Sequence, residues 1–310
     1  MKKVIFILTL ILLYSCNSGI IPKKNEEKPV SNKPKSFKMP EIPPTFSSRE
    51  QISSYVAEHY WDNFDFTDTT YINLPNITEQ AFVDYIYIMN ATPLTTGISS
   101  INKTMAKAET NRAMFIHFME LFEKYLYKTE SLLRNEELYI PVLNYIIGSD
   151  SIHDIDKILP MELLKMVLKN RVDNIASDFL ITLKSGKTVN LYDIKANYTL
   201  LLIYNPDCHA CAELMAGLKI SGILTSLIKS GKLKVVTVYP DADLEAWHNH
   251  IDEIPKEWIN GYDAAQVLSK EKLYDLKAIP TMYLLDKDKK VLIKDTDAVQ
   301  PIETYMMSAF

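Results

Sequence analysis

Apolar residues recur every three to four positions through residues 47–175, which is the spacing of amphipathic α-helices. A capping sequence at 47–50 predicts the start of the first helix. The longest periodic run, 101–127, predicts one long helix, and shorter runs predict helices at 137–147 and 161–168. No period of 20–50 residues repeats, which argues against a solenoid. This part of the chain therefore predicts a mostly α-helical domain.

After residue 175 the pattern changes to short apolar strands that alternate with helices. Strands are predicted at 179–183, 188–191, 199–204, 233–239, 281–285 and 291–294. The segment 199–204 is apolar throughout, as expected of a strand buried on both faces of a sheet. Helices are predicted in three places: from residue 208 with a break near Ser221, through 243–276, and from about residue 302. We expect an α/β protein in which a mixed sheet flanked by helices, 176–310, follows the helical domain of 47–175.

The first 46 residues follow neither pattern. Two lysines precede an apolar run, 4–13, that is too short to span a bilayer and predicts a signal peptide at 1–15. The sequence LYSC that ends at Cys16 resembles a bacterial lipobox, so we expect cleavage before Cys16 and lipidation of its sulfur. A plain signal peptide with an incidental cysteine is the alternative. Acyl chains on Cys16 would anchor the protein to a membrane, and the prolines and lysines of 16–46 predict an extended tether.

The composition argues against two classes of ligand. The 310 residues carry a formal net charge of -5 and a pI of about 5.8, without a basic stripe, so no nucleic-acid partner is expected. The eight glycines form neither a dinucleotide-binding fingerprint nor a P-loop, so a glycine-rich nucleotide site is not expected either.

The chemistry of the chain is indicated by its cysteines. If Cys16 is lipidated, Cys208 and Cys211 are the thiols that remain, and a CxxC pair in an oxidising compartment cycles between dithiol and disulfide. The strand predicted at 199–204 delivers Cys208 to the first turn of a helix, where free backbone N–H groups favour the thiolate. Cys211 lies one turn later on the same face, inside the fold. The pair predicts catalytic thiol chemistry in which Cys208 attacks and Cys211 resolves, with no cofactor besides the redox-active disulfide.

Four segments in this order resemble the thioredoxin-like domains of membrane-attached, TlpA/ResA-like thiol-disulfide oxidoreductases: DFLITLKSGKTVNLYDI, TLLLIYNPDCHAC, VVTVYPD and AIPTMYLLDKDKKVL. The resemblance covers 176–310 and implies a cis bond between Ile279 and Pro280. It also implies that the backbone at this bond pairs with an extended substrate segment opposite the cysteines. The expected partners are protein thiols and disulfides, together with a membrane redox partner that recycles the CxxC pair.

A second resemblance concerns HYWDNFDFTD at 59–68, which is similar to an uncharacterised helical domain found ahead of such domains in Gram-negative lipoproteins. It brings no known activity. We therefore expect a protein of the Gram-negative cell envelope, lipid-anchored to the inner or outer membrane and facing the periplasm or the cell surface. The acids of this segment could bind a metal with His59, but we interpret them as turn caps beside aromatic anchors.

Two residues beside the cysteines are expected to tune their reactivity. Asp207 stands where thioredoxins have tryptophan and places negative charge beside Cys208, which opposes the effect of the helix on the thiolate. His209 lies between the cysteines. When protonated it would favour the Cys208 thiolate and make the disulfide more oxidising, or it faces solvent with little effect.

The resemblance does not extend to the buried acids of the family. Leu202 stands where thioredoxin has an aspartate, and Leu214 stands where membrane-attached reductases have a glutamate. Glu213 is one residue away, which turns it about 100° around a helix. Glu213 is therefore a weak candidate for the group that accepts the proton of Cys211, and a surface acid is the alternative.

Two other functions stay open. His248 and His250 could add to a copper or zinc site in a metallochaperone, but the cysteines with His209 do not complete a tetrahedral set, so we expect no metal. CHACA is not the haem-attachment sequence CxxCH. A non-catalytic surface lipoprotein that binds a partner through its helical domain is the other alternative. We favour an envelope thiol-disulfide oxidoreductase, a reductase or isomerase rather than an oxidase, because Ile279 before the proline matches thioredoxin.

Overall fold

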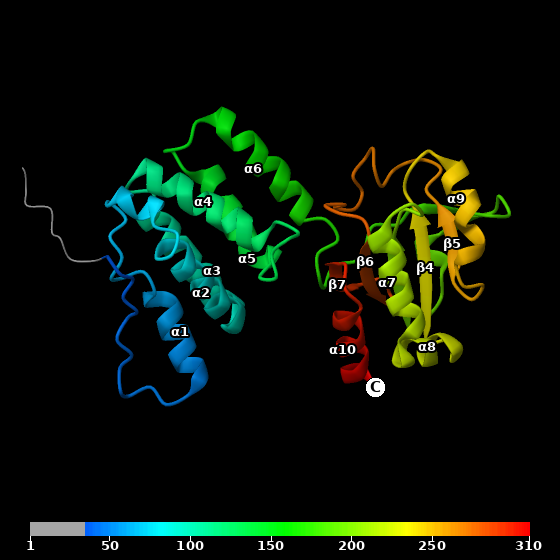
Figure 1. Ribbon diagram of the computed structural model, residues 1–310, viewed down its shortest axis with the longest axis horizontal. Helices are drawn as coiled ribbons and strands as arrows, with labels where there is room; N and C mark the ends of the chain where they lie inside the picture. The colour runs from blue at the N-terminus through cyan, green and yellow to red at the C-terminus, as the bar shows by residue number, and fades with distance from the viewer. Residues whose placement is uncertain (1–34) are drawn as a thin grey trace, which may run out of the picture. The chain divides into compact units, whose positions relative to one another are not determined.

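The computed structural model describes residues 35–310, so the expected signal peptide, Cys16 and most of the expected tether lie outside the described residues. Helices come first along the chain and a sheet follows (Figure 1). The helical part contains α1 (Arg49–His59), η1 (Thr69–Asn73), α2 (Thr78–Ala91), α3 (Leu94–Ala108), α4 (Arg112–Leu126), α5 (Glu136–Gly148) and α6 (Asp154–Val167). The mostly helical region that the sequence predicts ahead of the sheet is confirmed.

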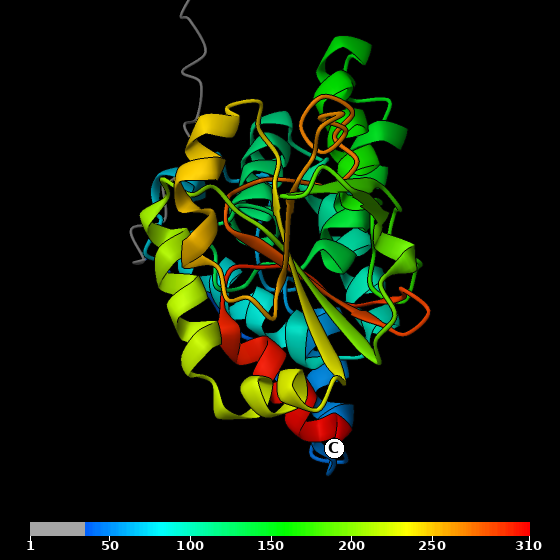
Figure 2. The ribbon, with the colours of Figure 1, turned by 90° about the vertical axis from the view of Figure 1, so that its right-hand side faces the viewer.

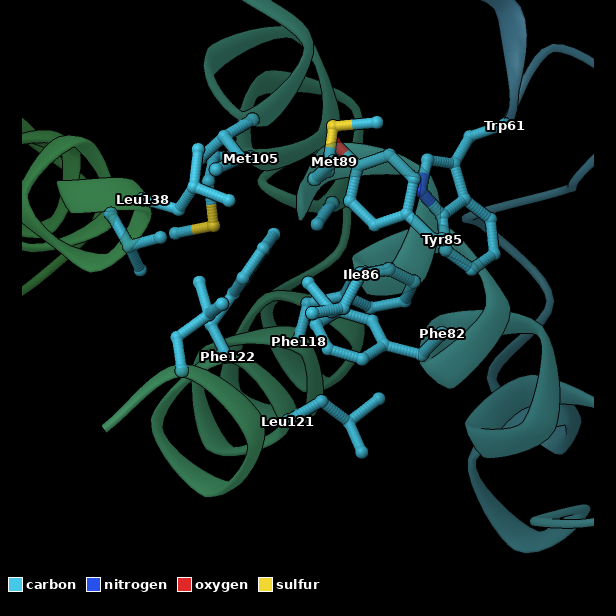
Figure 3. Packing of buried hydrophobic residues seen from close by; sticks show 14 of the residues in the cluster. Trp61, Phe82, Tyr85, Ile86, Met89, Met105, Phe118, Leu121, Phe122 and Leu138 are labelled. Atoms are coloured by element: carbon cyan, nitrogen blue, oxygen red, sulfur yellow. The ribbon is translucent and has the colours of Figure 1, made fainter. Parts of the chain in front are cut away.

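An aromatic core holds these helices together (Figure 3). The indole of Trp61 packs edge-on against Phe118 at 5.2 Å and against Tyr85 at 5.5 Å between ring centroids, and all three side chains are buried. Such aromatic pairs add stabilisation beyond the apolar area that they bury. Asp65 accepts hydrogen bonds from the backbone N–H and the hydroxyl of Thr67, as a turn cap does. The aromatic anchors are confirmed, as are the caps formed by Asp65 and Asp68, whereas Asp62 pairs with His59 and Lys107 instead.

The single long helix predicted at 101–127 is wrong, because the chain breaks between α3 and α4. Asn111 caps α4, and its side-chain oxygen accepts hydrogen bonds from the backbone N–H groups of Ala113 and Met114. Such a cap satisfies N–H groups that would otherwise be left free at a helix start. The apolar spacing continues through the break because α3 and α4 both pack on the same core, so periodicity alone did not reveal it.

The end of the expected tether contacts the helical core. The ring of Phe37 stacks on Tyr60 at 4.9 Å and lies edge-on to Trp61 at 5.4 Å. The side-chain amide of Asn63 donates a hydrogen bond to the Met39 carbonyl oxygen at 3.2 Å. Residues 35–46 contain neither helix nor strand, yet this stretch packs against the helices from Phe37 onward.

The C-terminal part is a seven-stranded mixed sheet in the order β2-β1-β5-β4-β3-β6-β7. Strands β3, β4 and β5 run parallel, and the other pairs are antiparallel. The strands are β1 (Leu180–Leu183), β2 (Thr188–Asn190), β3 (Tyr198–Ile203), β4 (Leu233–Tyr239), β5 (Ile259–Tyr262), β6 (Thr281–Asp286) and β7 (Val291–Thr296). The helices are η2 (Leu191–Asp193), α7 (His209–Ile220), α8 (Gly222–Lys229), α9 (Leu244–His250), η3 (Ile251–Glu253) and α10 (Val299–Ala309).

The central strand β3 is buried on both faces, as predicted. Leu200 and Leu202 belong to the cluster formed with α7 to α10, whereas Leu201 and Ile203 belong to the cluster on the opposite face. Figure 2 shows α7, α9 and α10 along one side of the strands. The α/β fold class, with its mixed sheet flanked by helices, is therefore confirmed.

The helix predicted through 243–276 is wrong beyond its first turns. Only α9 and the short η3 are helical there, and β5 follows as a four-residue strand between β4 and β1. A Cβ at Gly261 would lie 2.5 Å from Ile181 Cγ2 and 2.7 Å from the Thr182 carbonyl oxygen. Glycine thus permits the close approach of β1, which periodicity within so short a strand does not indicate.

Within the described residues, no single helix is long and apolar enough to cross a membrane. The pair α7 and α8, bent by 70° at their junction, meets the length and composition criteria together.

Candidate functional site

The loop between β3 and α7 places Cys208 at the N-cap of α7. Its Sγ accepts a hydrogen bond from the backbone N–H of Cys211 at 3.3 Å. The Asn205 carbonyl oxygen accepts from the Cys208 N–H, and the Asn205 side chain accepts from the Asp207 N–H at 3.0 Å. Asn205 therefore shapes the turn that presents the half-buried Cys208 sulfur at a helix N-terminus, where N–H groups favour a negative charge.

Cys211 is in a different environment. Its side chain has 0% exposure and packs in the core formed with α7 to α10. Its Sγ accepts a hydrogen bond from the Asn205 N–H at 3.5 Å. Burial, followed by the hydrogen bond and charge of Cys208, raises the pKa of the Cys211 thiol to about 12. At neutral pH Cys211 is therefore a protonated, shielded thiol.

The bond between Ile279 and Pro280 is cis, as the family resemblance implies. Ile203 at the end of β3 pairs with Thr281 at the start of β6. This register brings the residues just before Thr281 beside the loop that carries Cys208. The Cys208 Sγ lies 3.6 Å from the Ile279 carbonyl oxygen, to which its S–H donates. The predicted apposition of the cysteine pair and the cis-proline is therefore present.

A groove of about 440 Å³ opens beside this pair. One wall is formed by α7 and the residues around the cis-proline, and the other includes Thr129 and Glu130 from the loop between α4 and α5. No pattern along the chain predicts this second wall, because the loop lies about 80 residues ahead of the cysteines.

The three residues expected to tune the cysteines lie at the surface. His209 Nε2 lies 3.2 Å from Glu213 Oε1, and both side chains are mostly exposed. Asp207 Oδ1 lies 3.8 Å from Nε2 of His250, a longer contact at the site's edge. Glu213 thus has His209 as its recorded partner and is not among the groups that shift the pKa of Cys211. The roles of all three in tuning the cysteines stay predictions.

The two histidines of α9 do not act together. His250 contacts the Ala246 carbonyl oxygen and Asp207, whereas the His248 ring packs against Trp247 at 5.0 Å between centroids. In residues 35–310, no three His, Cys, Asp or Glu side chains are grouped so that they could hold a metal ion. The contact between His250 and Asp207 was not predicted, because it depends on how α9 packs beside the cysteine loop.

A buried polar network includes Tyr204 and Trp247, which belong to the same core cluster as Cys211. The Asn260 side-chain oxygen accepts hydrogen bonds from Thr237 at 3.0 Å, Tyr204 at 3.2 Å and Trp247 at 3.4 Å. Burial raises the pKa of Tyr204 to about 12. These neutral donors fix the core around Cys211 and supply no carboxylate that would accept its proton.

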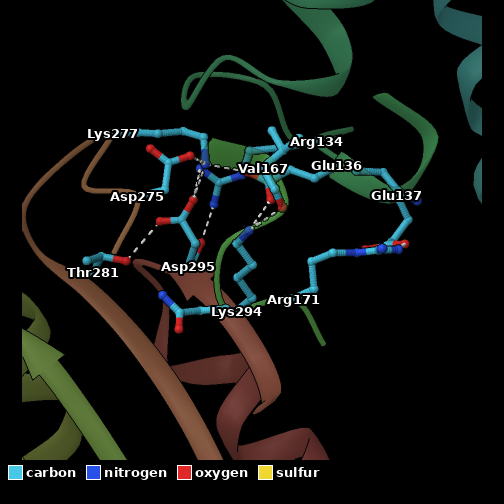
Figure 4. Close-up of polar contacts among 12 residues, drawn as sticks. Arg134, Glu136, Glu137, Val167, Arg171, Asp275, Lys277, Thr281, Lys294 and Asp295 are labelled. Carbon is cyan, nitrogen blue, oxygen red and sulfur yellow. Dashed lines mark hydrogen bonds and ion pairs between the residues drawn. The ribbon is translucent and has the colours of Figure 1, made fainter. Parts of the chain in front are cut away.

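A charge cluster ties the cis-proline segment to the helical region (Figure 4). It consists of Arg134, Glu136, Asp275, Lys277, Lys294 and Asp295, and we call it the interdomain charge cluster. Lys277 Nζ lies 2.8 Å from carboxylate oxygens of both Asp275 and Asp295 and also pairs with Glu136. Burial opposes the positive charge, but these carboxylates outweigh it and raise the pKa of Lys277.

Asp295 is the centre of this cluster. Its Oδ1 accepts a hydrogen bond from the hydroxyl of Thr281 at 2.8 Å, and its backbone oxygen accepts one from Arg134 of the helical region. Lys277 and Thr281 lie on either side of the Ile279–Pro280 bond along the chain. Asp295 therefore holds the cis-proline segment from both ends and links it to the helices.

Comparisons with known proteins agree with this architecture. The family described as "Domain of unknown function (DUF5106)" matches residues 15–170, and the family described as "Thioredoxin-like" matches residues 196–291. A solved thioredoxin-like protein from Bacteroides caccae is 46% identical over 90% of this chain and all of its own, with a TM-score of 0.87. The chain therefore belongs to the thioredoxin-like proteins that carry a DUF5106 domain ahead of the thioredoxin-like domain.

Two further solved structures match the C-terminal part alone. The C-terminal domain of an uncharacterized protein from Bacteroides fragilis is 48% identical, with 44% of this chain and 98% of that chain covered and a TM-score of 0.44. The thioredoxin domain of a thiol-disulfide oxidoreductase from Bacteroides vulgatus is 21% identical, with 44% and 98% covered and a TM-score of 0.37. Among curated proteins there is no match.

Proposed function

We propose that this protein is a thiol-disulfide oxidoreductase that acts on protein disulfides through Cys208 and Cys211. The observation that carries the proposal is the unequal pair itself. The Cys208 Sγ lies at the N-cap of α7 and 3.6 Å from the Ile279 carbonyl oxygen, whereas Cys211 is fully buried. One accessible thiol beside a cis-proline and one shielded thiol in reach is the arrangement that two-step disulfide exchange requires.

In the direction of reduction, the Cys208 thiolate attacks one sulfur of a substrate disulfide. A Cys208–substrate disulfide forms, and the other substrate sulfur leaves as a thiolate that takes up a proton. Cys211, once deprotonated, attacks the Cys208 sulfur, so that the Cys208–Cys211 disulfide forms and the second substrate thiol leaves. The substrate gains two electrons and the protein loses two. A membrane-bound dithiol partner is proposed to reduce the protein again.

We propose the reducing or isomerising direction over the oxidising one, because Ile279 precedes the cis-proline as it does in thioredoxin. The reduction potential of the Cys208–Cys211 pair against glutathione tests both the activity and its direction. We expect a value near the thioredoxin figure of about -270 mV. A value near -120 mV, which is typical of a strong oxidant, would contradict the direction, and a pair that does not equilibrate with glutathione at all would contradict the activity.

We further propose that the protein is anchored by lipid on Cys16 in the envelope of a Gram-negative bacterium. Support comes from the LYSC sequence at 13–16 and from relatives found in Bacteroides. Expressed in such a host, Cys16→Ala should abolish partitioning into the detergent phase. Unchanged partitioning and unchanged mass of the variant would contradict lipidation. Neither outcome bears on the redox proposal, because Cys16 takes no part in the chemistry of Cys208 and Cys211.

A further inference from the structure

We propose that the helical domain selects the substrate: its loop between α4 and α5 forms a negatively charged wall of the groove beside Cys208. This wall favours extended, cysteine-bearing protein segments with positively charged residues next to the cysteine. The inference rests on the proposed oxidoreductase function and deepens it, because it assigns the substrate class and gives the helical domain a role.

The lining of the groove carries the charge argument. Glu130 enters from the helical domain, and Glu213 and Asp297 enter from the thioredoxin-like domain, while lysine, arginine and histidine are absent from the lining. Glu213 has His209 at 3.2 Å on the exposed rim. For Glu130 and Asp297, both exposed, no ion pair is recorded within the part of the chain that the structure describes. A positively charged side chain on the substrate would therefore complement the negative charge of the groove.

The apolar part of the lining fits the same occupant. Leu214, Ile279 and Pro280 line the groove where an added strand would run past the cis-proline. At about 440 Å³, the groove has room for the side chains of a short extended segment and not for a folded surface. The cysteine of such a segment would face Cys208 while its neighbours reach Glu130.

The loop between α4 and α5 that forms this wall is bound at both ends to the thioredoxin-like domain. The Lys277 Nζ lies over the Tyr127 ring at 4.9 Å from its centroid, and Tyr127 stacks on Tyr139 of α5 at 5.3 Å. At the other end of the loop, Arg134 donates to the Asp295 carbonyl oxygen. Both ends of the loop are therefore fixed to the residues that hold the cis-proline, which keeps the backbone at Glu130 beside the groove.

The test uses the full mature chain and two synthetic peptides. Each peptide carries one cysteine joined by a disulfide to thiopyridine, with lysines beside the cysteine in one peptide and glutamates in the other. The attack of Cys208 on the peptide sulfur releases thiopyridone, whose absorbance gives the rate. Each rate is divided by the rate at which the same peptide reacts with dithiothreitol, which corrects for the difference in intrinsic reactivity between the two peptides.

We expect the lysine peptide to react roughly fivefold faster or more, since several exposed charge pairs each contribute modestly. The preference should shrink at high salt. Glu130→Gln should reduce it by about two- to fivefold, and Glu130→Lys should reduce it further. The matched control, Glu120→Lys, places the same charge change on the exposed face of α4, away from the groove, and should leave the preference unchanged.

The outcomes separate this inference from the function on which it rests. A neutral small disulfide, 2-hydroxyethyl disulfide, reports thiol exchange without charge selection. If the wild-type chain reduces it but shows equal rates with both peptides, or if Glu130→Lys and Glu120→Lys behave alike, the inference is overturned and the oxidoreductase stands. If the wild-type chain reacts with none of the three disulfides, the proposed function itself is overturned.

Discussion

The two cysteines of this protein differ in reactivity because their surroundings differ. Cys208 lies half-buried at a helix N-cap, where the Cys211 backbone N–H donates to its sulfur, whereas the Cys211 side chain has no exposure. Once a substrate is attached to Cys208, the contribution of Cys208 to the raised pKa of Cys211 ends, but the larger contribution from burial stays. Cys211 must therefore lose its proton against the effect of burial before the second step of the exchange.

This difference predicts a pH dependence for Cys211. In Cys208→Ser, we expect alkylation of Cys211 to rise about tenfold per pH unit from pH 7 to beyond 9, because the thiolate fraction keeps growing until the raised pKa is reached. The unfolded variant in denaturant is the control, and its rate should level off near the ordinary cysteine pKa of about 8.5. Levelling at that same pH in the folded variant would show that burial does not raise the pKa of Cys211.

At the scale of elements, the short strand β5 shows how the sheet is assembled. It runs parallel to β4 and antiparallel to β1, and it fits between them because Gly261 has no side chain. A β-carbon there would meet the Thr182 backbone, which cannot move aside as the end of a flexible side chain does.

We therefore expect Gly261→Ala to lower the free energy of unfolding by about 1–3 kcal/mol, the usual effect of overpacking. Gly148→Ala at the end of α5 is the matched control, because a Cβ there meets no atom within 4 Å and its φ is not positive. Urea unfolding of the two variants measures both effects. Equal stability of the two variants would mean that the β1–β5 contact is not tight.

The elements also show what the sequence can and cannot predict. Strand β3 was predicted from its apolar run, which Thr199 alone interrupts, and the break between α7 and α8 because Ser221 and Gly222 interrupt an apolar run. Strand β5 was missed because four residues with a glycine carry no clear period. In the site, Cys208 and Cys211 were found from their spacing along the chain, and the cis-proline was expected from the family resemblance. Glu130 was not found, and His250 was considered only as a metal ligand, because tertiary packing alone brings Glu130 to the groove and His250 to Asp207.

At the scale of the whole molecule, the interdomain charge cluster links two separately packed regions. The helical core and the two cores of the sheet share no residues, yet Glu136 of α5 pairs with both Lys277 and Lys294. Their side chains are at most 12% exposed. Removal of one partner from such a pair leaves a buried charge less well compensated.

Glu136→Gln should therefore destabilise the protein by about 1–3 kcal/mol, since hydrogen bonds to charged groups are lost in a buried setting. The neighbouring Glu137→Gln is the control. Glu137 pairs with Arg171, and both side chains are about a third exposed, so its loss should cost less than about 1 kcal/mol. Urea unfolding compares the two variants, with the midpoints read at equal dependence of the unfolding free energy on urea. Similar losses of unfolding free energy would contradict the structural role given to Glu136.

The central claim is that Cys208 attacks and Cys211 resolves, and covalent trapping with a disulfide-bonded protein such as insulin tests it most directly. Cys211→Ser should accumulate insulin chains disulfide-linked to Cys208, visible on non-reducing gels and released by dithiothreitol. Cys208→Ser should trap almost none, because its remaining thiol is fully buried and its pKa is raised. Equal trapping by the two variants, or more trapping by Cys208→Ser, would contradict the account.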